Sequence, residues 1–184
     1  MRIRVLGGGW YGCSLALSLI DAGHQVELHE ISDHLFAGAS GGNPARLHLG
    51  FHYPRSKLTR AMCQEHTGLF MERHGDLTHG VPVNIYAIAD RDSVLDFGTY
   101  KQVLRNEIEF VSIDTPMEYG LRHIEGAILT GERHIVIDKA RKHFERRLDG
   151  HIRFRHPPGE VNDPRWDWTI DATFCALDQE NVDR

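Results

Sequence analysis

A cluster of glycines directly after a short apolar run is the feature that most constrains the fold of this chain. Residues 7–9 are all glycine; they follow the run at 3–6, and apolar residues at helical spacing come next, at 10–22. A second apolar run, QVELHE, ends at Glu30. This order is typical of a strand, a tight turn, a helix and a second strand. The sequence therefore predicts a β-α-β unit, and its turn is the place to expect a ligand.

The spacing of the glycines predicts that this ligand is a dinucleotide. Gly7, Gly9 and Gly12 fit G-x-G-x-x-G. In this pattern the first glycine permits the tight turn, the second lets backbone approach a diphosphate, and the third lets the helix pack closely on the strand. The helix would begin at Trp10 and Tyr11, so its unpaired N–H groups and positive dipole end would face the phosphates without any lysine.

Glu30 predicts how the ribose is held. It lies 18 positions after Gly12, at the end of the second strand, where a carboxylate accepts hydrogen bonds from ribose hydroxyls. An acid at this position also disfavours the 2'-phosphate of NADP, so FAD and NAD remain. A glycine-rich turn can serve only to connect two strands. Here the strand before it, the helix after it and the acid all favour binding.

Composition excludes several other classes of protein. The chain has 184 residues, 41% of them hydrophobic, which suits one globular domain or one domain with part of another. The net charge of -5 argues against nucleic acid as the main partner. Cys13, Cys63 and Cys175 are odd in number and far apart, which disfavours a disulfide scaffold or a zinc site and favours a cytoplasmic location. No apolar run is long enough for a membrane span, and the first residues lead directly into a strand without a signal peptide.

Beyond Glu30 the pattern changes. Residues 31–55 are rich in glycine, histidine and small residues and lack a clear periodicity, and a loop of that length is usually functional. Further along, the patterns predict helices over 56–74, 93–106 and 138–148, the last capped by Asp138, strands over 83–89, 151–156 and 168–174, and a broken pair of strands in 120–138 that turns at Gly131.

The long loop resembles the FAD-dependent oxidoreductases of the D-amino-acid oxidase superfamily. In that family a small-residue and serine loop that touches the FAD diphosphate follows the second strand, and residues 39–43, with Ser40 and Asn43, are similar to it. The stretch RLHLGFHYPRSKLTRAMC is most similar to the L-2-hydroxyglutarate oxidase branch, in which a histidine, a glycine and an aromatic pair precede a Pro-x-Ser segment. The matching positions hold Arg46, His48, Gly50, His52 and Tyr53.

The resemblance implies a fold, a cofactor and a reaction. The fold is α/β, a Rossmann-like, doubly wound FAD-binding sheet with an inserted, incomplete antiparallel segment on the substrate side. The FAD-binding domain would comprise residues 1–80 and 135–184, and the partial substrate-side segment residues 81–134. The implied reaction is oxidation of a small amino acid or 2-hydroxy acid, with hydride transfer to flavin N5 and an arginine that clamps the substrate carboxylate.

His48 and His52 are the candidate catalytic residues. On a helix their spacing would suit metal ligands, but Gly50 and Pro54 make a helix improbable, so we expect no metal site. We expect at least one of them to face the flavin or the substrate; packing or solvent exposure is the alternative. Arg46 is a candidate for a contact with a phosphate or a substrate carboxylate, because guanidinium offers a planar fork of donors. An exposed structural arginine is the alternative there.

Two departures from the family pattern raise alternatives. Phe174 replaces a glycine that would allow close backbone approach to the cofactor, and the chain is shorter than family members. We therefore expect a truncated fragment of a longer enzyme, or a chain that depends on a partner, with self-association through an incomplete sheet edge. One rival function is an NAD-dependent dehydrogenase or epimerase, which predicts regular strand and helix alternation directly after Glu30. The other is a noncatalytic dinucleotide-binding remnant.

Overall fold

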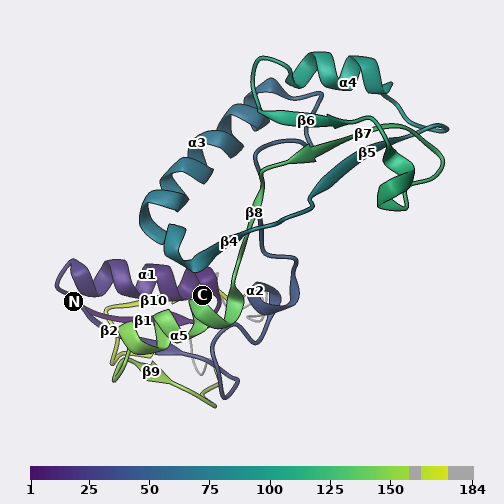
Figure 1. Cartoon of the computed structure of the whole chain (residues 1–184). Helices are drawn as coiled ribbons and strands as arrows, with labels where there is room; N and C mark the ends of the chain where they lie inside the picture. The colour runs from purple at the N-terminus through teal and green to yellow at the C-terminus, as the bar shows by residue number, and fades with distance from the viewer. Residues whose placement is uncertain (158–162, 174–184) are drawn as a thin grey trace. The chain divides into compact units, whose positions relative to one another are not determined.

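The chain forms two compact units. The computed structural model describes residues 1–157 and 163–173 (Figure 1). The first unit contains Met1–Ala45 and the described residues from Val136 onward, and the second contains Arg46–Ile135. The chain thus begins the first unit, builds the whole of the second, and then returns to complete the first.

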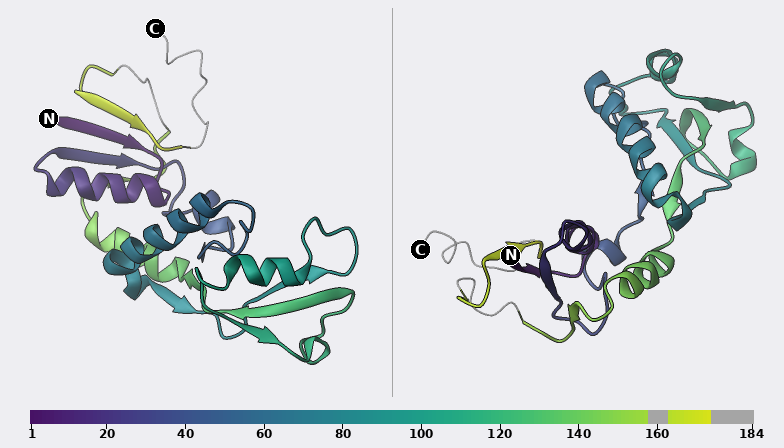
Figure 2. Two further views of the ribbon diagram at one scale, coloured as in Figure 1. Left: turned by 90° about the horizontal axis from the view of Figure 1, so that it is seen from above. Right: turned by 90° about the vertical axis from the view of Figure 1, so that its left-hand side faces the viewer.

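A parallel four-stranded sheet forms the centre of the first unit. Its strands lie in the order β10-β1-β2-β9, and every neighbouring pair is parallel. Their bounds are Arg2–Leu6 for β1, Gln25–His29 for β2, Ile152–Arg153 for β9 and Trp168–Asp171 for β10. Figure 2 shows β10, in yellow, beside β1. Val5 is fully buried between Ile170 and Leu28 on the two neighbouring strands, so apolar runs suit this parallel sheet.

Two helices pack in the first unit. Helix α1 (Trp10–Asp21) buries a face that contains Gly12, Cys13, Ala16 and Leu17, and the small residues on it allow a close approach to the sheet. Helix α5 (Ile137–Arg147) buries Ala140 and Phe144. The rings of Trp10, Phe36 and Phe144 contact one another, with centroids 5.3–5.9 Å apart. A four-residue helix, α2 (Ala39–Gly42), follows β2.

An antiparallel sheet forms the main part of the second unit. Its order is β5-β7-β6, with bounds Ile85–Ala89, Ile124–Thr130 and Phe110–Ile113. Helix α4 (Phe97–Leu104) lies over this sheet (Figure 1), and the Phe97 ring packs where Gly126 of β7 leaves room for it. A 3-10 helix, η2 (Pro116–Tyr119), follows β6. The buried core consists of Phe51, Tyr100, Leu104, Ile108 and Ile128.

A smaller antiparallel sheet completes the second unit. Strand β8 (Arg133–Ile135) pairs with both β3 (Arg46–Leu47) and β4 (Thr78–Gly80). Helix α3 (Lys57–His74) begins after Ser56, whose hydroxyl accepts a hydrogen bond from the Thr59 amide, and the 3-10 helix η1 (Gly75–Leu77) follows it. The apolar side chains of Leu58, Met62 and Leu69 on α3 are exposed in this structure.

Three features differ from the sequence predictions. Two strands, β7 and β8, flank Gly131 as predicted, but they belong to different sheets and do not pair with each other. Asp138 does not cap α5, because that helix begins at Ile137, two residues after β8 ends; Asp138 lies in the first turn and pairs with Arg141. Residues 46–80, predicted with the first domain, pack in the second unit, because β3 pairs with β8.

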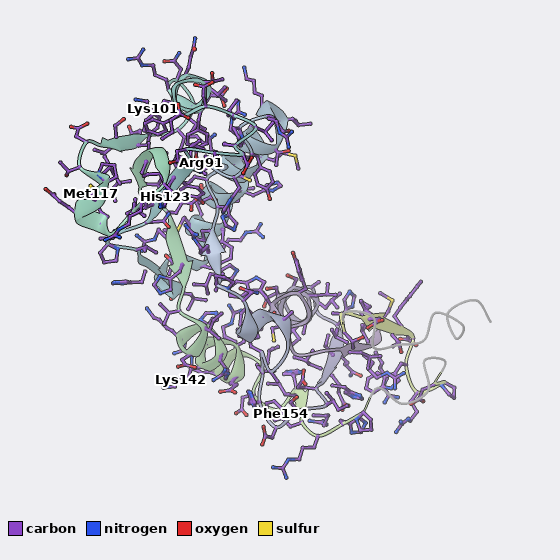
Figure 3. The ribbon with its side chains drawn as sticks, turned by 90° about the vertical axis from the view of Figure 1, so that its right-hand side faces the viewer. Arg91, Lys101, Met117, His123, Lys142 and Phe154 are labelled. Carbon is purple, nitrogen blue, oxygen red and sulfur yellow. The ribbon has the colours of Figure 1, made fainter. Side chains whose placement is uncertain are left out.

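The surface carries some large side chains. Met117 on η2 is 80% exposed, and Lys142 on α5 and Phe154 after β9 are also exposed (Figure 3). Within residues 1–157 and 163–173, no helix combines the length and apolar composition needed to cross a bilayer.

Truncation of a buried side chain in the parallel sheet should destabilise the first unit. Leu28 is fully buried, and all three tryptophans of the chain lie in the first unit, so tryptophan fluorescence reports on its unfolding. Leu28→Ala should lower the free energy of unfolding by about 2–5 kcal/mol in urea titrations. The control Ile31→Ala, at a position 67% exposed, should change it by less than about 0.5 kcal/mol. Equal effects from the two variants would contradict the assigned core.

Candidate functional site

The carboxyl ends of three parallel strands meet at one edge of the first unit's sheet. The turn of residues 7–9 follows β1, Glu30 follows β2, and Ala172 follows β10. The chain runs outward from β1 to β2 and β9 and then crosses back to place β10 on the other side of β1, so the strand order reverses there. In open parallel sheets, ligands bind in the crevice at this position.

A cavity of about 540 Å³ lies at this edge. It is lined by every predicted cofactor-binding residue except Gly12 and Arg46: Gly7, Gly9, Trp10, Tyr11, Glu30, Ser40 and Asn43. It is also lined by residues that the sequence reasoning did not single out for binding, including Gly8, His29, Ile31, Ser32, His156 and Thr173. The structure therefore brings together, around one cavity, residues from five segments of the first unit.

Two glycines are required by the geometry of the turn itself. Gly7 has a φ of +99°, in the left-handed region, and a Cβ on it would lie 2.7 Å from the carbonyl oxygen of Ala172. A Cβ on Gly12 would overlap the carbonyl oxygen of Gly7. The roles predicted for these two residues, a tight turn and a close approach of the helix, match the positions in which the structure places them.

Gly8 and Gly9, between the first strand and the helix, keep space around the cavity. A Cβ on Gly8 would lie 2.8 Å from Glu30 Oε2 and 2.7 Å from Leu35 Cδ2, so a side chain here would displace the ends of both side chains. The sequence signal for Gly8 was its place inside a run of three glycines. Gly9 has a φ of -78°, which any residue can adopt, and a Cβ there would lie 3.1 Å from Ser40 Oγ. Because Gly9 lines the cavity, its missing side chain leaves the backbone accessible to a ligand.

Glu30 is buried and joins the turn to the second strand. Its Oε2 accepts a hydrogen bond of 2.6 Å from the Gly8 amide, and its Oε1 accepts one of 2.8 Å from the Ser32 amide. A carboxylate offers about four lone-pair sites, so both oxygens keep capacity for a further donor. Glu30 therefore fixes the shape of the turn and also presents an acceptor at the cavity wall.

The amino end of α1 supplies donors to the same cavity. Its N-cap residue, Gly9, has no side chain to cap the helix, and the Trp10 amide donates a hydrogen bond of 2.9 Å to Ser40 Oγ. The amides of Tyr11 and Gly12 have no acceptor within the part of the chain that the structure describes. Unpaired N–H groups at a helix amino end, with the positive end of the helix dipole, stabilise an anion such as a phosphate.

The α2 segment is closed by Asn43. Its Nδ2 donates a hydrogen bond of 2.7 Å to the Ala39 carbonyl, and its Oδ1 accepts one of 2.6 Å from the Ala45 amide. These bonds fold the small-residue loop back on itself. The loop therefore presents Ser40 to α1 and leaves small residues at the cavity wall.

Two histidines that the sequence reasoning did not single out lie at the same cavity. The rings of His29 and His156 are in edge contact, with centroids 4.3 Å apart. Burial lowers the pKa of His29, the hydrogen bond to Glu27 opposes this shift, and the nearby His156 lowers the pKa further. Two adjoining aromatic rings at the cavity wall suit an aromatic ligand group such as a nucleobase. His29 and His156 are far apart in the sequence, so their ring contact could not be predicted from the sequence alone.

The predicted catalytic residues lie in the second unit. The rings of His48 and His52 have centroids 4.9 Å apart, and the ring of Tyr86 lies 4.8 Å from that of His52. Burial, and then the proximity of His48, lower the pKa of His52. No cluster of three or more metal-ligating side chains occurs in residues 1–157 and 163–173.

Arg46 is paired within the second unit. Its guanidinium donates hydrogen bonds to Asn84 and, at 3.2 Å, to Glu132, and it lies over the Tyr86 ring. Glu132 was not predicted as a functional residue, yet only 1% of its surface is exposed. It stands in the short link between β7 and β8, and an acid in a glycine-containing link gives no sequence signal of burial.

Other predicted features can also be placed. After Glu30 the chain forms a loop with only the short elements α2 and β3, not the regular alternation that an NAD-dependent dehydrogenase or epimerase predicts. Cys13 is buried and Cys63 half-buried, and both are free thiols. Burial raises the pKa of both thiols, which suits packing. Phe174 and Cys175 lie outside the described residues.

Comparison with known proteins finds relatives that are described as FAD-dependent. No family model matches the chain. The chain is 33% identical over 181 residues to the FAD-dependent monooxygenase FPY4 of Fusarium mangiferae. The alignment covers 94% of this chain and 49% of that protein. The chain therefore spans about half the length of this curated relative.

Solved structures share the fold. L-α-glycerophosphate oxidase from Mycoplasma pneumoniae with FAD bound superposes with a TM-score of 0.61 and 18% identity, over 83% of this chain and 44% of that chain. Glycine oxidase from Geobacillus kaustophilus gives a TM-score of 0.60 and 17% identity, over 83% and 46%. These similarities confirm the predicted α/β fold with a Rossmann-like parallel sheet.

Substitutions at two glycines should separate binding from folding. Gly9→Val should leave the fluorescence-detected unfolding midpoint near that of the unmodified chain and weaken ADP binding, measured by calorimetry, at least about tenfold, because its side chain enters the cavity. Gly12→Val should lower the unfolding midpoint, because the side chain overlaps the Gly7 carbonyl.

The control for both is Gly68→Ala on α3, where a Cβ meets nothing within 4 Å. It should leave ADP binding unchanged and should not lower the unfolding midpoint, because alanine is the better helix former. Undiminished ADP binding by Gly9→Val would show that the ligand does not approach the turn at this position.

Proposed function

We propose that this chain belongs to the FAD-dependent oxidoreductases of the D-amino-acid oxidase superfamily, binds FAD in the cavity of its first unit and serves the oxidation of a small molecule. The observation that carries the proposal is the joint placement of the glycine turn, the amino end of α1 and Glu30 around one cavity.

The residues at this cavity fit the parts of the cofactor. The backbone at Gly9 and the unpaired amide of Tyr11 would hold the diphosphate, because they offer donors without a side chain in the way. The small-residue loop around Ser40 would lie against the same group. Glu30 would accept hydrogen bonds from the ribose hydroxyls, since its carboxylate keeps acceptor capacity beside Gly8 and Ser32. The paired rings of His29 and His156 would lie near the adenine.

The chemistry divides between cofactor and protein. Bound FAD supplies a two-electron acceptor at flavin N5, and the protein binds, orients and tunes the electrostatics. The substrate class that we propose is a small amino acid or 2-hydroxy acid, which would lose a hydride from the C–H bond next to its amine or hydroxyl. His48 and His52 are proposed to contact the substrate or the flavin, and Arg46 an anionic group.

Several further predictions stay part of the proposal. The FAD-binding domain, taken as a functional unit, would comprise residues 1–80 and 135–184, including residues 46–80 that pack in the second unit, with residues 81–134 on the substrate side. The protein would reside in the cytoplasm and could self-associate through a sheet edge, where β9 and β10 are the outer strands of the described sheet. Because the chain spans about half of its curated relative, the activity of the whole protein is itself proposed.

Reconstitution with FAD tests the proposal. The purified chain should bind added FAD and acquire the visible absorbance of an oxidised flavin. Glu30→Gln should weaken FAD binding about 10- to 150-fold, because hydrogen bonds to a charged group contribute about 1.5–3 kcal/mol. The control Asp21→Asn, at the exposed carboxyl end of α1, should bind FAD normally.

The outcomes separate the rival functions. Bleaching of the bound flavin by a 2-hydroxy acid or an amino acid supports the oxidoreductase. A flavin that binds but is reduced by no candidate acid supports the noncatalytic remnant. Binding of NADH in preference to FAD supports the dehydrogenase, and binding of neither contradicts a dinucleotide site.

A further inference from the structure

Glu132 is a buried carboxylate at the centre of the second unit's polar cluster. Its side chain is completely shielded from solvent. One oxygen, Oε2, accepts three hydrogen bonds: 2.7 Å from the Tyr86 hydroxyl, 3.1 Å from Asn84 Nδ2 and 3.2 Å from Arg46 Nη2. A buried charge is costly unless it is paired and hydrogen-bonded, and Arg46 provides the opposite charge.

The other oxygen of Glu132 has spare acceptor capacity. Oε1 accepts one hydrogen bond, of 2.8 Å, from the Leu49 amide, although a carboxylate oxygen offers two lone pairs. His48 Nδ1 lies 3.9 Å from this oxygen. That nitrogen is itself buried, and no described residue forms a hydrogen bond with it. An acceptor with spare capacity therefore lies close to a ring nitrogen that has no hydrogen-bond partner among the described residues.

The backbone around His48 is fixed on both sides. The amide that binds Glu132 belongs to Leu49, the next residue, and the carbonyl oxygen of His48 accepts a hydrogen bond of 3.1 Å from Thr67 Oγ1 on α3. The ring can therefore change its distance to the carboxylate mainly by side-chain rotation. Although Nδ1 is buried, 40% of the side chain is exposed, so the ring reaches solvent through its other edge.

The charge of Glu132 discriminates between the two neutral forms of His48. With the proton on Nε2, the lone pair of Nδ1 would point at the carboxylate, and the two would repel each other. With the proton on Nδ1, the ring can donate toward Oε1 and its Nε2 is a free acceptor. His52 contacts the His48 ring, Arg46 and Tyr86 bind Glu132, and the carboxylate of Glu132 lies 3.9 Å from Nδ1.

We propose that Glu132 is a positioning residue for His48, which holds the proton of the neutral ring on Nδ1 and leaves Nε2 as a proton acceptor. The use of that acceptor rests on the proposed function: Nε2 would take the proton that a substrate O–H or N–H group loses, while the C–H hydride passes to flavin. The hydride carries both electrons to the flavin and the imidazole gains only the proton, so the step is balanced.

The tautomer of His48 can be measured in the chain without any cofactor. Nitrogen-15 NMR of the imidazole rings distinguishes a protonated Nδ1 from a protonated Nε2, and a His48→Gln variant identifies which signals belong to His48. The unmodified chain should show the Nδ1–H form once His48 is neutral. An Nε2–H form would overturn the proposal, and this reading needs no substitution at Glu132.

A charge-removing variant provides the second reading. Glu132→Gln should shift neutral His48 toward the Nε2–H form in the same nitrogen-15 spectra, because the neutral amide no longer favours a proton on the nearby Nδ1. The control Glu109→Gln, at an exposed acid of the same unit, should leave the tautomer of His48 unchanged. An unaltered tautomer in a folded Glu132→Gln variant would also overturn the proposal. Both NMR measurements are made without FAD. Failure of FAD to bind would therefore contradict the proposed function and leave the proposal for Glu132 and His48 testable.

Discussion

The close approach of α1 to the end of β1 is the constraint on which the rest of the first unit depends. Gly12 lies against the carbonyl oxygen of Gly7, where even a methyl group would overlap it. This contact brings the amides of Tyr11 and Gly12, which have no acceptor among the described residues, to the edge of the sheet. Glu30 reaches that edge from β2 and fixes the turn through the Gly8 amide. A backbone site of this kind binds anions without any basic side chain.

The second unit organises its polar groups in a different way. There the donors are side chains of Arg46, Asn84 and Tyr86, and they converge on the single buried carboxylate of Glu132. Removal of one partner from such a network leaves a buried polar group unsatisfied, so the members hold one another in place. Arg46 is already paired in this network, so an anionic substrate group that binds it would share it with Glu132.

The sequence predicted those parts of the fold and site that depend on local patterns. The glycines at 7, 9 and 12 and the acid at position 30 occupy the β-α-β unit as their spacing predicts, and α1 and α3 begin within a residue of their predicted starts. Pairing over long distances could not be predicted. The assignment of β7 and β8 to different sheets depends on partners as distant as β3.

The missed site residues have the same explanation. His29 and His156 become neighbours only because β9 pairs beside β2. Glu132 is buried because donors from two other segments, 46–49 and 84–86, surround it, and its own surroundings in the sequence look like an ordinary turn. Single residues that acquire their role from tertiary contacts carry no periodicity or spacing that a sequence could display.

The central claim is that the amino end of α1 and the glycine turn hold a diphosphate. The most direct measurement is a titration of the nitrogen-15-labelled chain with ADP, followed through its backbone amide NMR signals. The account predicts that the largest shifts occur at Gly8, Gly9, Trp10 and Tyr11. Shifts confined to other parts of the chain, or none at saturating ADP, would contradict it.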